Sequence, residues 1–366
     1  MKRTFTITLI GLISMCCGIM AQDYKKEWRD GKLTWADFIE RTGEKGVSEL
    51  RYFFGYNTGS QEYNNIVVKK YIVQAYVDRN LSWVDPQYKT EQYLRYNQVI
   101  FNIIEIHRRR LQAEVDRVGY LFEIEGKFNI IQSSCTNEID KFQWESSGGH
   151  NFNSIVFWEQ KTSYELNVYS EKLIPEFENR SFGYALHAGL GGGYFTGSIG
   201  EYFNPSFNFI FGFDFAYKKS ILYLNGTLAG CKVKKDYFSD KNWYEKQNVG
   251  LAIIDVSYGY AFLDNKKLKL SPFVGLGITE LTGQNKDNKE AALRLVDYNV
   301  IFGLNADYKI RTTINIAPNM GVKEKVETSI RTRLYITKAD FAPDLNGYSI
   351  NLTVGLCGFG NMIRVK

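Results

Sequence analysis

SFNFIFGFDFAYK, residues 206–218, decides the fold of the second half of the chain. Aromatic side chains occupy every second position, at Phe207, Phe209, Phe211, Phe213, Phe215 and Tyr217. The positions between them are small or polar and include Gly212 and Asp214. Because successive side chains of a strand point to opposite faces, one face is aromatic and the other polar. This alternation is typical of a strand with lipid on one side and a crowded polar interior on the other.

The same alternation recurs along residues 182–366. Further strands are predicted near residues 182–191, 222–228, 254–262, 268–279, 296–308 and 348–356. Residues 312–317 and 326–337 also have strand character, and we interpret them as one strand with a bulge near residues 319–325. Two separate strands would instead give a larger barrel. This half resembles small outer-membrane β-barrels, which predicts an all-β transmembrane antiparallel barrel of about eight strands.

The connections between these strands predict the orientation of the barrel. Short turns near residues 217–220 and 264–267 alternate with long polar loops at residues 232–247 and 282–294. Outer-membrane barrels have short periplasmic turns and longer external loops. We therefore expect an outer-membrane location, with the residues before 182 in the periplasm.

Composition excludes other classes. The chain has 366 residues, 50 of them Tyr or Phe, and a net charge of +5 with both signs spread along it. Its mean hydropathy of −0.29 excludes a helical membrane bundle, and no basic patch suggests a nucleic-acid partner. Lys2 and Arg3, the apolar residues 4–15 and Ala21 predict a signal peptide over residues 1–21. A lipoprotein cysteine at Cys16 or Cys17 is the alternative.

The first half has mixed secondary structure. Residues 50–56 and 66–78 read as strands, and residues 90–117 as a long helix. Residues 120–134 and 151–166 read as helical or mixed. We therefore predict an α+β domain over residues 32–167, a linker over 168–181 and the barrel over 182–366.

The long helix carries a family resemblance. Residues 81–112 read LSWVDPQYKTEQYLRYNQVIFNIIEIHRRRLQ. They are similar to a bacterial family of secreted, zinc-peptidase-like domains of unknown function, whose helix reads roughly H-E-Q-x-H-F-D-I-x-E-x-x-x-R-R-L. The matching residues are Ser82, Trp83, Val84, Gln98, Phe101, Ile103, Glu105, Arg109, Arg110 and Leu111. A later His-Gly turn and a helix with Trp correspond to His150 and Trp158.

Departures from this motif remove the chemistry that it supports. In H-E-x-x-H, two histidines one turn apart bind Zn²⁺ and the glutamate activates a water. Tyr96, Asn97 and Ile100 stand at those three positions here, and Glu105 follows. The resemblance thus implies a degenerate peptidase fold with no metal and no cofactor. We expect His107, Arg109, His150 and Trp158 to serve a binding role in the periplasm.

Charged residues are also predicted inside the barrel. His187, Asp214, Asp255, Lys269, Asp297 and Asp307 fall on the inward face of their strands. We expect the aspartates to pair with Lys269, Arg331 and Arg333. Since a barrel of about eight strands is only wide enough for its own side chains, this predicts a filled interior and no pore.

These features favour a non-catalytic outer-membrane barrel that anchors a periplasmic interaction domain. The expected partners are outer-membrane lipid and a periplasmic protein, peptide or glycan. One alternative is an outer-membrane enzyme, either a residual hydrolase or a lipid-modifying barrel. Another is a soluble secreted adhesin-like protein, in which the aromatic face of residues 207–215 would be buried elsewhere.

Overall fold

The computed structural model describes residues 24–366 except 173, 239–241, 284–292 and 318–320. The predicted signal peptide therefore lies outside the described residues. The chain forms two compact units. The first comprises Met1–Gly59, Lys70–Pro175 and Ala317–Gly321, and the second comprises Ser60–Lys69, Glu176–Ile316 and Val322–Lys366. Within the described part, no helix has the length and apolarity to cross a membrane.

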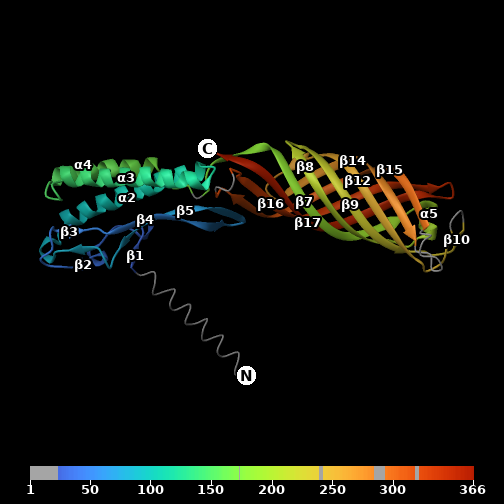
Figure 1. The fold of residues 1–366 in the computed structure, drawn as a ribbon, viewed down its shortest axis with the longest axis horizontal. Helices are drawn as coiled ribbons and strands as arrows, with labels where there is room; N and C mark the ends of the chain where they lie inside the picture. Colours follow the sequence, from blue (N-terminus) through green and yellow to red (C-terminus); the bar gives the residue numbers. More distant parts are fainter. Residues whose placement is uncertain (1–23, 173, 239–241, 284–292, 318–320) are drawn as a thin grey trace, which may run out of the picture. The chain divides into compact units, whose positions relative to one another are not determined.

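Three long helices dominate the first unit. They are α2 (Glu91–Arg117), α3 (Leu121–Glu145) and α4 (Phe152–Val168), and α2 packs against both of the others (Figure 1). Thr90 is the N-cap residue of α2, but its side chain makes no capping hydrogen bond. The segment predicted as helical or mixed over residues 120–134 is helical throughout and extends to Glu145.

Short strands and one long hairpin complete the first unit. The small sheet has the order β2–β6–β3, formed by Ile39–Glu40, Trp83–Val84 and Ser48–Glu49. The hairpin consists of β4 (Tyr52–Tyr63) and β5 (Ile66–Asp78), and β1 (Lys25–Lys26) pairs with β5. Single-turn helices lie at Trp28–Asp30, Trp35–Asp37 and Pro86–Tyr88. The strand prediction for residues 66–78 is confirmed.

The second unit is a closed antiparallel barrel of eight strands, each paired with the next along the chain (Figure 1). The last strand pairs with the first, Val354 opposite Leu190, so the barrel has no free edge along this line. The strands are β7 (Phe177–Phe195), β8 (Ser206–Tyr217), β9 (Ser220–Lys232), β12 (Asn248–Tyr260), β14 (Leu268–Gly283), β15 (Leu293–Asn315), β16 (Glu324–Ala342) and β17 (Leu345–Val365).

The predicted strand count is confirmed, but one boundary is wrong. Residues 312–315 end β15 and residues 324–337 belong to β16, and the two run antiparallel with Thr313 opposite Val326. The chain reverses between them, and Gly321 has φ 73°, a left-handed value that glycine adopts without strain. The predicted bulge near residues 319–325 is therefore a turn, of which residues 318–320 lie outside the described part.

The predicted linker also needs correction. Residues 177–181, which we assigned to it, open β7, and residues 177–179 pair with the end of β17. The side chains of residues 177–181 do not alternate between apolar and polar, so the sequence pattern did not indicate a strand there. The strand is defined by its backbone pairing. Tip residues of the β4–β5 hairpin belong to this unit as well, where residues 66–69 pair in parallel with residues 312–315 of β15.

We call the end of the barrel where β7 begins and β17 ends the near end, and the opposite end the far end. Near-end connections are residues 218–219, 261–267 and 316–323, the second containing β13 (Leu263–Asp264). Far-end connections are residues 196–205, 233–247, 284–292 and 343–344. The predicted alternation of short and long connections therefore fails at the two-residue turn 343–344.

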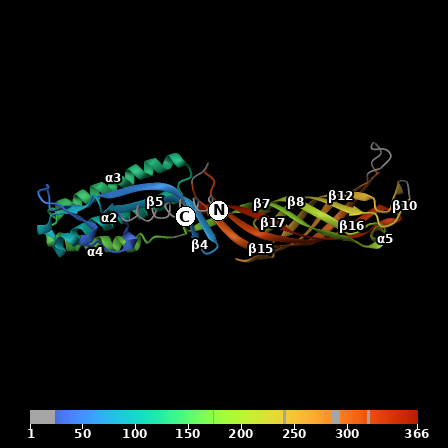
Figure 2. The same cartoon turned by 90° about the horizontal axis from the view of Figure 1, so that it is seen from below.

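Small elements and aromatic side chains fill the far end. Figure 2 shows α5 (Gly197–Tyr202) and β10 (Tyr237–Phe238) at this end. Strand β10 pairs with β11 (Asn242–Trp243). The rings of Phe203 and Trp243 meet edge to face at 5.0 Å, and both are fully buried. The far end therefore has its own apolar core.

Candidate functional site

The three degenerate motif positions lie on the buried face of α2. Tyr96, Asn97 and Ile100 are each 5% exposed or less. The ring of Tyr96 stacks on Phe142 of α3 at 5.2 Å. Helical spacing places these residues on one side of α2, and that side faces α3.

A cleft of about 450 Å³ opens at this point of the first unit. Its walls come from three places: α2, α3 and the segment that contains β3. The lining residues are Ser48, Glu49, Leu50, Arg51, Tyr52, Tyr96, Asn97, Ile100, Thr136, Ile139, Asp140 and Gln143. A cleft of this size is within the range of small-ligand sites. Tyr96, Asn97 and Ile100, which the sequence comparison predicted to replace metal ligands and base, thus line an open cleft here.

Asn97 presents an unpaired acceptor in this cleft. Its Nδ2 donates to the Tyr93 carbonyl at 2.8 Å and to Ser48 Oγ at 3.0 Å, whereas its buried Oδ1 has no partner among the described residues. A carbonyl accepts only, so the Tyr93 contact fixes which atom of the amide is the donor.

Hydroxyl groups in the cleft stay protonated. Burial raises the pKa of Tyr96 to about 12, partly offset by a hydrogen bond with Gln143. Burial also raises the pKa of Tyr52, next to Cys135 and Thr136. Neither phenol can therefore act as a base near neutral pH.

Glu105, one turn beyond the degenerate motif, has a structural role. Its carboxylate accepts from Arg109 Nε at 2.7 Å and from Arg108 Nε and Nη2 at 2.7 and 2.8 Å. Burial lowers the pKa of Arg108, but the Glu105 carboxylate outweighs this and raises it overall. Arg109 also donates to the Leu166 and Tyr169 carbonyls, which occupies the side chain that we expected at a binding surface.

His107 and Trp158, for which we predicted a binding role, are both buried in this structure. His107 is 0% exposed and its Nε2 lies 2.8 Å from Glu138 Oε2. Trp158 is 1% exposed and donates to Glu145 Oε2 at 2.7 Å. Both side chains support the packing of the three helices.

His150 differs from these two, because it is exposed at the turn before α4 and its Nδ1 lies 2.9 Å from Tyr93 Oη. Across the described ranges, no group of three or more His, Cys, Asp or Glu side chains is placed to hold a metal ion.

The predicted interior ion pairs form in the barrel, with two exceptions. Arg331 lies between Asp307, at 2.7 Å, and Asp214, at 2.8 Å, and Arg333 pairs with Asp255 at 3.3 Å. Lys269 instead lies with its ammonium 3.7 Å from the centroid of the Phe359 ring. Asp297 is half-buried toward the far end and accepts from the backbone N–H of Asp340 at 2.9 Å.

His187 joins this interior network. Its Nε2 lies 3.1 Å from Asn225 Oδ1 and 3.6 Å from Asp214 Oδ1, and Asn225 Nδ2 donates to Asp255 at 2.8 Å. Gly212 is opposite His187, and a Cβ there would approach the imidazole Nε2 to 2.6 Å. A cavity of only about 10 Å³ remains beside Arg331 and Arg333, roughly the space of one water.

The outer surface of the barrel is apolar along every strand. Large hydrophobic side chains there are 37% exposed at Leu224 and up to 79% at Tyr298. Exposed aromatic residues lie at both limits of this apolar surface. The near-end set is Phe182, Tyr184, Tyr217, Tyr258, Tyr260, Phe262 and Tyr308, and the far-end set is Tyr194, Phe207, Tyr298 and Tyr348. No described side chain that faces outward between these two sets carries a charge.

Strand register places near-end aromatic residues at one level. Phe182 is opposite Tyr217, and Ser220 is opposite both Tyr217 and Tyr260. These three rings therefore belong to one band around the barrel.

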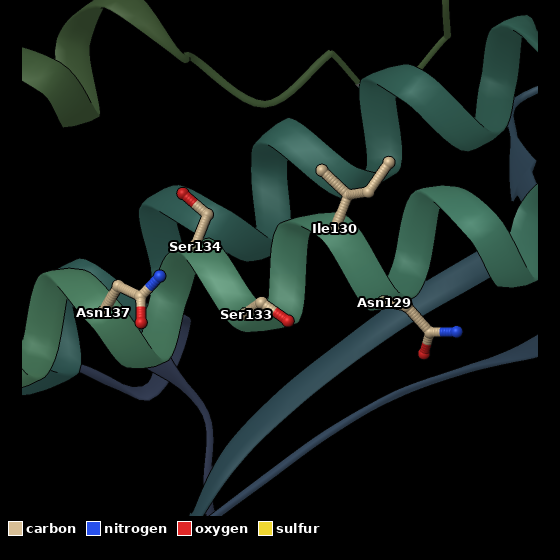
Figure 3. A pocket seen from close by; sticks show the side chains of 5 residues that line it. All are labelled: Asn129, Ile130, Ser133, Ser134 and Asn137. Carbon is tan, nitrogen blue, oxygen red and sulfur yellow. The ribbon is translucent and has the colours of Figure 1, made fainter.

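Sequence reasoning missed most of the cleft. Ser48, Glu49, Arg51, Thr136, Asp140 and Gln143 were not singled out, although the last three have helical spacing with Ile139. A second hollow, of about 520 Å³, is lined by Asn129, Ile130, Ser133, Ser134 and Asn137, all on the exposed side of α3 (Figure 3). One helix alone cannot enclose a ligand, so the first cleft is the better candidate.

Comparisons with known proteins give similarity to solved barrels only. No family model matches the chain, and no curated protein matches it. Ail of Yersinia pestis covers 50% of this chain and 99% of its own, at 9% identity and a TM-score of 0.27. The match to Neisserial surface protein A covers 52% of this chain and 96% of that protein's chain, at 15% identity and a TM-score of 0.27. The match to outer membrane protein OprG of Pseudomonas aeruginosa covers 50% of this chain and 97% of that protein's chain, at 10% identity and a TM-score of 0.31. At these scores, the barrel assignment depends on the strand pairing described above.

Proposed function

We propose that this protein is a non-catalytic outer-membrane barrel that anchors a periplasmic binding domain. The observation that carries the proposal is the apolar outer surface of a closed barrel whose interior is polar. Lipid-facing surfaces of outer-membrane barrels have this apolar band with aromatic residues at both limits.

A water-soluble barrel would have the opposite distribution. Soluble proteins rarely expose large contiguous apolar patches, whereas here every barrel strand contributes to one. Residues 207–217 of β8 reach from one limit of the apolar surface to the other. This number of residues is about what a tilted strand needs to cross a bilayer. Closure of the barrel pairs the backbone groups, which lipid requires.

The orientation follows from the connections. The near end carries the two-residue turn 218–219, the start of β7 and the end of β17. There the Lys366 N–H donates a hydrogen bond to the Glu176 carbonyl. Three of the four far-end connections are longer. Because short turns are periplasmic in such barrels, we place the near end and the first unit in the periplasm.

The binding half of the proposal comes from the cleft at Asn97. It retains an open site where the similar family would hold zinc, but it offers hydrogen-bonding groups in place of metal ligands and base. A periplasmic peptide is the partner that this lining suits, and the barrel supplies attachment to the membrane.

Fractionation and gel mobility test the membrane assignment. We expect the protein in the outer membrane, with a folded form that migrates faster in detergent and shifts on boiling. A variant that lacks residues 345–366 should lose the shift, because β17 closes the barrel. Recovery of the intact protein in the soluble fraction without a heat shift would contradict the proposal.

A further inference from the structure

One side of helix α4 is exposed and uncharged. All residues of this helix are described, and its charged side chains are Glu159, Lys161 and Glu165. Glu159 accepts from Arg95 Nε of α2 at 2.8 Å, and Lys161 lies 2.5 Å from Glu138 of α3 and 3.9 Å from Glu165. These ion pairs hold the charges of α4 on the side that faces the rest of the first unit.

The other side of α4 carries large apolar side chains at regular spacing. Phe157 is 61% exposed, Tyr164 71% and Val168 55%. Exposed amides precede, separate and follow the two rings. We call this line the α4 seam, and it consists of Asn153, Phe157, Gln160, Tyr164 and Asn167. Its steps of four, three, four and three residues match the repeat by which two helices pair side by side.

The alternation of amides and rings along the α4 seam favours a second copy of the same helix as the occupant. In a parallel pair in register, each seam residue faces its own counterpart across the axis. An amide has both donors and an acceptor, so Asn153, Gln160 and Asn167 can each hydrogen-bond to the same residue of the other copy. Phe157 and Tyr164 then meet their counterparts ring to ring.

Other arrangements leave the amides of the seam unmatched. A shift by one layer places each amide against a ring, and an apolar surface offers the amides no partner at all. The seam also carries no charge that would attract an anionic or cationic partner. The amide layers therefore specify both the partner and the register, as polar residues do at such positions of coiled coils.

We propose that this protein self-associates through parallel, in-register pairing of α4 with α4 of a second copy. The seam is short, since residues 153–167 span about 21 Å of helix. Confinement of the copies to one membrane would raise their effective concentration and so support a weak contact. The inference goes beyond the proposed function, because the seam includes none of the residues that line the cleft or form the barrel.

Cysteine cross-linking in isolated outer membranes of cells that produce the full chain tests this inference. Asn153→Cys and Asn167→Cys are made separately and oxidised with copper phenanthroline. Both should give a disulfide-linked product of twice the monomer mass, because only a parallel pair in register brings both positions close to their counterparts. Ser133→Cys, exposed on α3 (Figure 3), reports random collision and should react about tenfold more slowly. Cys135, Cys231 and Cys357 are buried and add little background.

A charge placed in the α4 seam gives a second test. Phe157→Lys in the Asn167→Cys background brings two ammonium groups together across the axis and should slow cross-linking about tenfold. Gln132→Lys adds the same charge at an exposed position of α3 and should leave the rate unchanged.

Four outcomes would overturn the inference. These are cross-linking of only one of the two seam cysteines, equal rates for the seam cysteines and Ser133→Cys, equal rates for Phe157→Lys and Gln132→Lys, or a product whose mass shows a different protein. The heat shift is measured on the same membranes, so a failure of self-association is distinguished from a failure of the barrel assignment.

Discussion

At the scale of single residues, Glu105, which the sequence matched to a peptidase-like motif, contributes to the packing of the first unit. It pairs with the buried Arg108 and the half-buried Arg109 on the same helix, and Arg108 also lies 3.1 Å from Glu171. Removing one partner of a buried ion pair leaves an uncompensated charge. The residue is thus required by the packing of the first unit, whatever the cleft binds.

We therefore expect Glu105→Gln to lower the free energy of unfolding of the first unit by about 3 kcal/mol. Chemical denaturation followed by the helical circular dichroism signal measures this change. Glu125→Gln, an exposed change on α3, should stay within about 0.5 kcal/mol of the wild type. Equal effects of the two substitutions would show that the arginines do not depend on Glu105.

Glu138 makes the first unit sensitive to acid. The hydrogen bond from His107 and the nearby Lys161 ammonium lower the pKa of Glu138 from 4.5 to about 2, although burial acts in the opposite direction. A lowered pKa in the folded state means that the ionised form stabilises the fold above the unfolded pKa. This contribution disappears as the pH falls through about 2.

Stability of the first unit should thus decrease as the pH falls from about 4.5 to about 2, and Glu138→Gln should make this decrease smaller. Denaturation midpoints across this pH range test the expectation. The neighbouring Cys135 thiol has a pKa raised to about 12 by burial and does not titrate there. Identical pH profiles for the wild type and the variant would assign the acid sensitivity to other groups.

At the scale of elements, β8 has one outward apolar face and one interior face. Phe211 is near the middle of its outward face, where its ring covers Gly226 of β9. Tyr217 ends the same strand in the near-end aromatic band. The two positions share a strand and a face, but they differ in their expected depth in the bilayer.

Phe211→Arg should destabilise the barrel by about 2–4 kcal/mol, and Tyr217→Arg by at most about 1 kcal/mol, because the cost of a charge falls toward the interface. Unfolding in lipid vesicles, monitored by the heat-shift assay, gives both values. If Phe211→Arg were as mild as Tyr217→Arg, the middle of β8 would face water and the proposed membrane assignment would fail.

Elements with strong periodicity were predictable from the sequence, and those defined by long-range contacts were not. The alternation in β8 and the apolar residues of α2 predicted both correctly. The end of β15 and the start of β7 lie beyond the apolar band, where pairing with distant residues makes the strand. The cleft was missed for the same reason, because its walls are brought together from residues 48–52, 96–100 and 136–143.

At the scale of the whole molecule, the described interior of the barrel is crowded with charged side chains of both signs. Three buried basic side chains, Lys269, Arg331 and Arg333, accompany three buried aspartates, Asp214, Asp255 and Asp307. The charges balance, and the cavity beside the arginines has room for about one water. Among the described residues, this leaves little space for water beside the arginines.

We accordingly expect no unitary conductance from the purified protein in planar bilayers under an applied voltage. Insertion is verified first by protection of the barrel from protease. An absence of current can then be attributed to the inserted protein and not to a failure to insert. Reproducible current steps from the inserted wild-type protein would require an open path past Arg331 and would contradict the filled interior.

Closure of the barrel between β7 and β17 has a consequence for its biogenesis. Val354 and Leu190 are neighbours in space, but most of the barrel sequence separates them. Contacts between residues so distant in sequence form slowly, because the intervening chain must be ordered first. Until β17 arrives, β7 and β16 each present an unpaired edge that invites association with other chains. The nascent protein should therefore depend on a factor that shields these edges during transit, and the demand for that factor should end at the moment when β17 pairs with β7.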